Sequence, residues 1–394
     1  MKKTLVALAT LSAIGSAFAD IDVSGGIKLY GVLDQAALKQ TWQSSGSAVG
    51  TSTGQYTTGN NNSNAGLYAA AATSRLGVRG TRNLGDDITG LLQIEIELQP
   101  QINSDQALSG KSQNGLLPMK NRGTFVGLER ANVGTIKFGT QETTAYELFA
   151  MDVNGRVEYK PQVWRYVASN STQDRAGNAL KYTSAEFSGF KADVMYAFPE
   201  GTNNGTNAKN TPAFTSYGLK YHAGNLKAAW VVDFSKGSNS ADQSAGVYRM
   251  PGDQYEGVTT IGEGTKTTYA YQSGLTTLRR NIAGLTYDFG PALVNLIYAD
   301  SGNANGKLTT TTVGIRVPLD KFSLAASYGT GSYSGFKSAG NAVNGKVGDV
   351  TIGAYYNFDK STSVYLLNSN ATHTYLTNTG GYTNSTAVGV QYRF

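Results

Sequence analysis

The side chains that most often carry out catalysis are scarce in this sequence. Its 394 residues include no cysteine and only two histidines, His222 and His373. Neither histidine has a serine and an acid nearby in an arrangement typical of a nucleophilic site. No Cys/His spacing fits a zinc site either. The sequence therefore predicts no enzyme, no metal site and no organic cofactor.

Charged side chains are the other group that could carry chemistry, and many alternate with apolar ones. In a β-strand, successive side chains point to opposite faces, so such alternation separates charged from apolar residues. Charges gathered on the inner wall of a channel would set ion selectivity, with Arg and Lys favouring anions. The basic candidates are Lys28, Arg75, Arg79, Arg122, Lys137, Lys181, Lys220 and Arg280.

Carboxylates occupy comparable positions. Those on the alternating stretches are Asp34, Glu95, Glu97 and Asp288, and the connection at 141–177 adds Glu142, Glu147, Asp152 and Glu158. A basic wall facing an acidic loop would create a transverse field that orients dipolar solutes. The alternative is that individual charges only solvate a wide wall or pair with one another.

The elements that would position these charges are short stretches of period-two hydrophobicity, which predict β-strands. Sixteen such stretches occur, at 26–38, 74–81, 89–99, 121–129, 133–140, 178–185, 189–198, 214–222, 225–234, 279–289, 292–300, 309–319, 321–331, 348–358, 361–370 and 385–394.

The connections between these stretches alternate in length. Seven are short and carry the Gly, Asn, Asp and Pro that tight turns require, as in "RNLGDD" and "DFGP". Eight are longer and polar, at 39–66, 100–120, 141–177, 199–213, 235–278, 301–308, 332–347 and 371–384. Short turns on one side and long loops on the other are typical of an antiparallel transmembrane barrel.

The first residues predict export. Lys2 and Lys3 precede an apolar run, and the segment closes with "AFA" at 17–19. This order is that of a secretory signal peptide. Cleavage after Ala19 would leave residues 20–394 as one barrel domain. The charge left after cleavage is 31 basic against 27 acidic residues, since two lysines leave with the signal. That balance gives no reason to expect nucleic acid as a partner.

The last stretch, "STAVGVQYRF", favours a membrane barrel over a soluble sandwich or propeller. Val388, Val390, Tyr392 and Phe394 alternate with small or polar residues. An unpaired apolar edge strand would promote aggregation, whereas a closed barrel leaves no edge. We therefore expect this strand to pair with the first one, with its apolar face toward lipid. Tyr and Phe near strand ends are expected to form interfacial girdles, with Tyr30 and Tyr355 as inward exceptions.

Several stretches together resemble the general diffusion porins of Gram-negative bacteria, in particular the beta-proteobacterial branch. They are "KLYGVLDQ", "SRLGVRGTRNLGDDI", "NRGTFVGLERANVGTIKFGTQ", "NALKYTSAEFSGF", "GLTYDFG" and "VGVQYRF". The resemblance runs from the first strand to the last. It implies a 16-stranded antiparallel barrel in the outer membrane, a homotrimer, and a third loop folded into the lumen. It also implies passive diffusion of small hydrophilic solutes and ions, and contacts with outer-membrane lipid and lipopolysaccharide.

Site residues follow from the same resemblance. It places a basic cluster at Arg75, Arg122 and Lys181. The alternation along the strands adds Arg79 and Arg280 to the same inward face. The carboxylates expected opposite these cations are Glu142, Glu147 and Asp152. The resulting expectation is a pore that prefers anions. Phe394, with Tyr392, would form the signal that the outer-membrane assembly machinery recognises. The sequence departs from the family pattern at Gly139-Thr140, where Gly-Arg is common, and at Lys181, where Arg is common. An adhesin or surface receptor barrel with little conductance is the alternative, since the loops at 39–66 and 235–278 are long.

Overall fold

The computed structural model describes residues 21–43, 61–68, 70–98, 119–148, 151–153, 175–199, 213–236, 277–303, 306–338, 341–374 and 380–394. The signal peptide predicted at 1–19 lies outside the described residues, as does Glu158. Within the described part, no helix is both long and apolar enough to cross a membrane.

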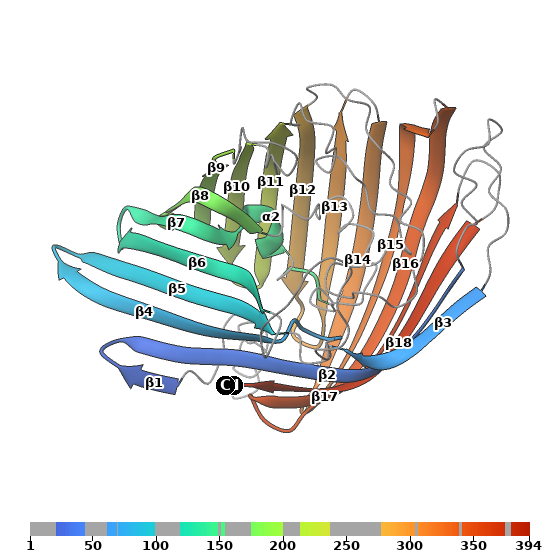
Figure 1. Cartoon of the computed structure of the whole chain (residues 1–394), viewed down its shortest axis with the longest axis horizontal. Helices are drawn as coiled ribbons and strands as arrows, with labels where there is room; N and C mark the ends of the chain where they lie inside the picture. Colours follow the sequence, from blue (N-terminus) through green and yellow to red (C-terminus); the bar gives the residue numbers. More distant parts are fainter. Residues whose placement is uncertain are drawn as a thin grey trace, which may run out of the picture.

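Almost all of the described chain is β-strand in a single antiparallel sheet (Figure 1). The strands are β1 Ile21–Ser24, β2 Ile27–Gln43, β3 Asn61–Tyr68, β4 Arg75–Gly85, β5 Ile88–Leu98, β6 Met119–Arg130, β7 Gly134–Glu142, β8 Arg175–Ser184, β9 Phe190–Ala197, β10 Phe214–Ala223, β11 Leu226–Lys236, β12 Thr277–Asp288, β13 Leu293–Asn303, β14 Gly306–Leu319, β15 Phe322–Ser338, β16 Asn341–Asn357, β17 Thr362–Thr374 and β18 Gly380–Arg393. A short helix, α2 at Thr144–Glu147, follows β7.

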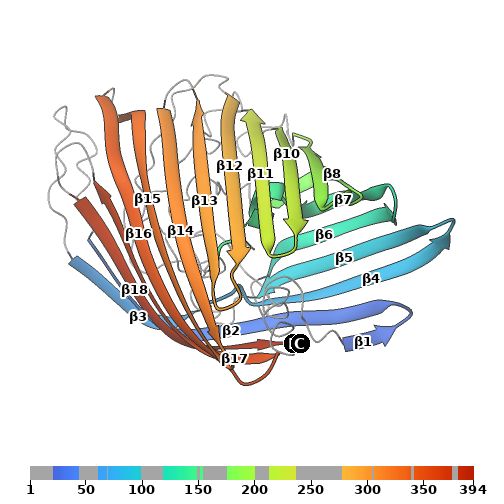
Figure 2. The same ribbon diagram turned by 180° about the vertical axis from the view of Figure 1, so that it is seen from behind.

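The sheet closes on itself as a barrel of sixteen strands. β3 and β4 pair with successive parts of β2 and count as one strand, and β1 only folds back on the start of β2, which leaves 18 − 2 = 16. The last strand, β18, pairs with β2 and completes the ring. Figure 2, turned by 180°, shows β10 to β18 in chain order side by side. The predicted fold class is therefore confirmed.

The seven short connections are tight turns. Between β4 and β5, Asp86 and Asp87 both have positive φ, 49° and 60°, as the central residues of a type I′ hairpin require. Between β16 and β17, the backbone N–H groups of Thr362 and Ser361 donate to Asp359 at 2.7 Å each. These bonds hold the pKa of the Asp359 carboxyl below its usual range.

Three of the predicted long connections, 301–308, 332–347 and 371–384, were wrong in extent. β13 continues to Asn303, and β14 begins at Gly306. Only residues 339–340 separate β15 from β16, and only residues 375–379 separate β17 from β18. His373 accordingly lies in β17. These stretches are rich in Ser, Thr, Asn and Gly, and they lack an apolar face. Backbone pairing alone extends the hairpins there, so period-two hydrophobicity gives no signal.

The start of the chain also departed from prediction. The predicted stretch at 26–38 covers the first part of β2, which continues to Gln43 and is preceded by β1. β3, at Asn61–Tyr68, lies largely in the stretch expected to be a loop, 39–66, because "NNSNAGLY" has no clear alternation that would predict a strand. It continues the strand that the sequence placed at 74–81, with an interruption between Tyr68 and Arg75.

The outer face of the barrel is apolar, as the alternation requires. Val388, Val390 and Tyr392 are 58%, 50% and 48% exposed, whereas Gln391 between them is 3% exposed and faces the interior. Aromatic residues gather near the short turns, where Tyr287 and Phe289 lie 4.6 Å apart between ring centroids. Such girdles mark the membrane interface.

The pairing of β18 with β2 that closes the ring continues to Phe394. The Gly31 N–H donates to the Phe394 carbonyl at 2.7 Å, and the Phe394 N–H donates to the Gly31 carbonyl at 3.1 Å. The Phe394 ring also lies over Gly31, where a Cβ would come within 2.5 Å of it. The absence of a side chain at Gly31 thus provides the space for the terminal aromatic ring.

The sidedness of the barrel can be tested with single cysteines, since the chain has none of its own. We expect Asn303→Cys, at the long-loop end, to react on intact cells with a maleimide on a polymer too large to cross the wall. Lys360→Cys, in the exposed turn beside Asp359, should react only after permeabilisation, because short turns face the periplasm. Both variants should label equally in permeabilised cells. Labelling of Lys360→Cys alone on intact cells would invert the topology.

Candidate functional site

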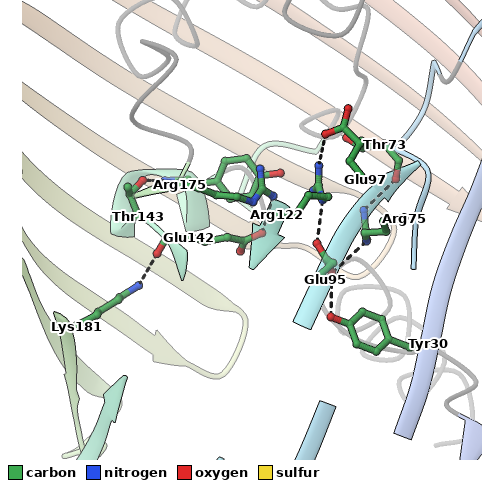
Figure 3. A network of polar contacts seen from close by, with 11 residues as sticks. Tyr30, Thr73, Arg75, Glu95, Glu97, Arg122, Glu142, Thr143, Arg175 and Lys181 are labelled. Atoms are coloured by element: carbon green, nitrogen blue, oxygen red, sulfur yellow. Dashed lines mark hydrogen bonds and ion pairs between the residues drawn. The ribbon is translucent and has the colours of Figure 1, made fainter. Parts of the chain in front are cut away.

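Glu95 is the centre of a charged cluster on the inner wall (Figure 3). Its carboxylate accepts from Arg122 Nε at 2.8 Å and from the Tyr30 hydroxyl at 3.0 Å, and it lies 3.6 Å from Arg75 Nε. Arg122 also donates to Glu97 at 3.4 Å through Nη1. Four neighbouring strands, β2, β4, β5 and β6, thus contribute side chains to one network. The cluster brings together Arg75 and Arg122, two of the three cations that the resemblance groups, whereas Lys181 contacts the backbone of Glu142.

Arg122 reaches the interior through an irregularity of β6. Glu95 pairs with Gly123 and Ile96 pairs with Asn121, so Arg122 is an extra residue that the β5–β6 register skips. Such a bulge re-aims the side chain that it carries. Continued alternation from the inward Phe125 and Gly123 would have placed residue 122 on the lipid face. The bulge instead buries the Arg122 guanidinium in the Glu95 cluster, with 5% of its side chain exposed.

The third loop begins beside a second group of charges. Arg175 Nη2 lies 3.0 Å from Glu142 Oε1, and the Arg175 guanidinium lies 4.6 Å above the Tyr146 ring. Lys181 donates to the backbone carbonyl of Glu142 at 3.4 Å. Thr143 caps α2 by accepting from the Tyr146 N–H at 3.2 Å. These contacts turn the chain away from β7 and into the barrel.

The described part of the third loop lies on a track of glycines. The side chain of Thr144 packs on Gly218 of β10, and Leu148 and Met151 pack on Gly284 of β12. Further on, Val153 packs on Gly314 of β14. Each glycine faces inward, and a Cβ at Gly218 or Gly314 would overlap the loop. α2 and 151–153 therefore lie against the inner wall from β10 to β14, which supports the expected inward position of this loop.

Hydrogen bonds fix the far end of the described loop. The Thr286 hydroxyl donates to the Met151 carbonyl at 2.7 Å, and the Val153 N–H donates to Asn295 at 3.2 Å. Arg316 donates from Nε to the Val153 carbonyl at 3.0 Å, and its guanidinium lies 4.7 Å above the Tyr355 ring. Asp152 is 1% exposed in this region.

The other predicted site residues lie near the Glu95 cluster or apart from it. Arg79 is stacked 5.1 Å from the Tyr30 ring and so borders the cluster. Arg280 lies on β12, with both its side chain and that of Asp233 buried in an ion pair of 3.3 Å. Its charge is compensated there, so Arg280 is not a further cation of the Glu95 cluster. Glu147 ends α2, and its side chain lies outside the described residues.

Sequence reasoning missed three contributors to this region. Arg175 lies inside the stretch predicted as the third loop, 141–177, but is the first residue of β8. Arg316 sits in an otherwise apolar stretch, and Asp193 pairs with Lys220 at 2.6 Å. The sequence could have indicated Arg316, because in "VGIRVPL" it alternates with apolar residues and so falls on the inward face of its strand. Nothing in the sequence indicates which inward cations acquire a carboxylate partner.

The geometry defines a closed transmembrane barrel with a loop folded against its inner wall and a charged cluster beside it. A model of the Gram-negative porin family matches residues 4–381. The chain is 26% identical to Outer membrane porin protein 32 of Delftia acidovorans over 93% of this chain and 88% of that protein. It is 27% identical to an outer membrane porin protein of Bordetella pertussis over 62% of each chain.

Solved structures share the fold at low identity. An anion-selective porin from Comamonas acidovorans superposes with a TM-score of 0.65 at 20% identity, over 93% of this chain and 99% of that chain. OmpF of Salmonella typhi, in complex with daunomycin, superposes with a TM-score of 0.63 at 18% identity, over 95% of this chain and 100% of that chain.

The chain belongs to the Gram-negative porin family. It is an outer-membrane channel for passive diffusion of small hydrophilic solutes.

The glycine track makes a prediction about the third loop. In Gly218→Val, the new side chain would overlap Thr144 and push α2 away from the wall into the lumen. We expect the barrel to fold and its single-channel conductance in a planar bilayer to fall. Leu219→Val, beside Gly218 on the outer face of β10 where this side chain is 45% exposed, is the control for a substitution in the same strand. Unchanged conductance of Gly218→Val would show that α2 does not border the conducting path.

Proposed function

We propose that the channel prefers anions, and that the third loop and the Glu95 cluster together form its narrowest part. The single observation that supports this best is the position of the cations. Arg75, Arg79, Arg122, Arg175 and Lys181 lie on the inner face of β4, β6 and β8, beside the point where the third loop enters the lumen. Guanidinium groups stay charged at any relevant pH and bind carboxylate or phosphate in a fork.

Carboxylates lie among these cations, since Glu95 contacts Arg75 and Arg122, Glu97 contacts Arg122, and Glu142 contacts Arg175. Elsewhere on the wall, Lys220 pairs with Asp193 and Arg280 pairs with Asp233. Anion selectivity is also stated for the Comamonas acidovorans porin, which has the same fold.

The remaining proposals concern assembly. A trimer form is described for OmpT, an outer membrane protein of Vibrio cholerae that superposes with a TM-score of 0.58, and we propose a homotrimer here. The apolar outer band would contact outer-membrane lipid and lipopolysaccharide, and residues 1–19 would direct export. The relatives are channels rather than enzymes, and we propose that this protein has no catalytic activity.

Ion selectivity tests the anion preference. We expect the zero-current potential across a KCl gradient to show anion preference for the wild type. In Arg75→Ala/Arg122→Ala this preference should fall by about threefold per charge removed, since a unit charge at roughly 6 Å in water is worth about 0.7 kcal/mol. Arg75→Lys/Arg122→Lys should stay near the wild type, because it keeps the charge.

A second variant separates charge from structural damage. Glu95→Gln removes the central carboxylate and retains hydrogen-bonding capacity, so its anion preference should increase. A cation-selective wild type would overturn the proposal, and a silent membrane with a folded barrel would favour the closed-barrel alternative of an adhesin.

The terminal residue makes a prediction about assembly. Deleting Phe394 removes its two backbone hydrogen bonds with Gly31 and the ring over Gly31. We expect a reduced yield of folded trimer in the outer membrane, measured by heat-modifiable mobility on gels. Phe394→Tyr, which keeps an aromatic ring, should assemble normally. A wild-type yield from the truncated chain would argue against a role of Phe394 in assembly.

A further inference from the structure

The strand formed by β3 and β4 contains three residues more than its pairing with β2 needs. Tyr68 pairs with Ala36, and Arg75 pairs with Val32. The two partners on β2 are four residues apart, whereas Tyr68 and Arg75 are seven apart, so the excess is 7 − 4 = 3 residues. The chain between them therefore leaves the sheet. We call its described part, Ala70–Ser74, the inner bend.

The inner bend points into the lumen because it is bound to an inward carboxylate. Asp34, which is 0% exposed, accepts from the N–H groups of Ala70 at 2.7 Å and Ala71 at 3.2 Å. The same carboxylate accepts from the Tyr365 hydroxyl at 2.7 Å and from Gln391 at 3.1 Å. Ser74 closes the bend, since its hydroxyl donates to the Asp34 carbonyl and accepts from the Asp34 N–H.

Apolar packing holds the same segment. Ala70 belongs to a buried cluster on the inner face of β2, β17 and β18. The cluster consists of Ala36, Leu38, Ala70, Tyr365, Leu367 and Ala387, with Ala71 and Tyr355 packed against it. An apolar patch on the inner wall of a water-filled channel is costly to leave hydrated, and the bend covers part of it.

The inner bend connects the two parts of the proposed constriction. On one side, the Thr73 carbonyl accepts from Arg75 Nη1 at 3.3 Å, which orients this cation beside Glu95 (Figure 3). On the other side, Tyr365 lies 6.4 Å from Tyr355 between ring centroids. Tyr355 in turn stacks with Arg316, which binds the third loop at Val153. Contacts therefore run from the third loop through the bend to the basic cluster.

We propose that the inner bend is a second pore-narrowing element, which borders the constriction where the third loop does not and which positions Arg75 for anions. The inference rests on the proposed function in one respect, namely that the constriction lies at the level of the Glu95 cluster. Asp34 is a positioning residue in this scheme, because it holds the bend and does not itself face the basic cluster.

Removing the excess residues is the direct experiment. Deletion of 70–72 restores continuous pairing of β3 and β4 with β2 and keeps Arg75 on its present face, because the spacing from Tyr68 becomes four. No charge is lost. We expect single-channel conductance in KCl to rise measurably, by tens of per cent, and larger neutral sugars to enter the pore in liposome-swelling assays. Leu67→Ala, on the outer face of β3 where this side chain is 63% exposed, keeps the length and should conduct as the wild type does.

A cysteine variant gives a second readout that does not depend on folding of the deletion. The chain has no cysteine, so Thr73→Cys can be modified selectively in an open channel. Attachment of a charged thiosulfonate reagent should reduce the current in steps, and a bulkier reagent should reduce it further. Lys360→Cys, in a short turn away from the lumen, should react without a change of current.

The outcomes separate this inference from the proposed function. Unchanged conductance of the deletion variant together with unblocked Thr73→Cys would overturn the role of the inner bend. If Gly218→Val and Arg75→Ala/Arg122→Ala nevertheless respond as expected, the constriction at the third loop stands. If those variants also have no effect, the proposed constriction itself fails.

Discussion

Closure of the sheet is the constraint on which the rest of this structure depends. In a bilayer every backbone N–H and C=O needs a partner within the protein, and β18 obtains its partners from β2. The pairing continues to the last residue, where Phe394 and Gly31 exchange two backbone hydrogen bonds. Once the ring is closed, each strand has one face toward lipid and one toward the interior. Every polar side chain at membrane depth must then lie inside, and the charges therefore gather on one surface.

Gathering the charges creates a second problem, because buried cations and carboxylates lose hydration. The barrel solves it by pairing. Glu95 lies among two guanidinium groups and a tyrosine hydroxyl, and Asp233 pairs with Arg280. Pairing also explains why a surplus of cations is needed for selectivity. If Arg280 is considered without Asp233, it suggests a wall that attracts anions. Its pair with Asp233 is neutral, so a net positive field requires more cations than carboxylates.

The sequence was sufficient for the fold and partly sufficient for the site. Period-two hydrophobicity and alternating connection lengths determine a closed barrel, since lipid outside and water inside repeat the same pattern along every strand. The signal disappears where hairpins extend into water, so the hydrophobic pattern does not predict β3 or the outer ends of β13 to β18. The inward cations Arg75 and Lys181 follow from parity. Their partners do not, because Glu95 and Glu142 become neighbours only through strand register, which a single sequence does not specify.

The elements around the proposed constriction are the places where the regular barrel pattern is broken. Arg122 faces inward only because β6 contains a bulge, and the inner bend exists because one strand is three residues too long. The described part of the third loop lies against the wall because glycines on β10, β12 and β14 leave room for it. A perfectly regular barrel of sixteen strands would enclose a wide lumen of nearly uniform width. Narrowing it at one level requires local exceptions to alternation, and such exceptions are what period-based reading of a sequence cannot detect.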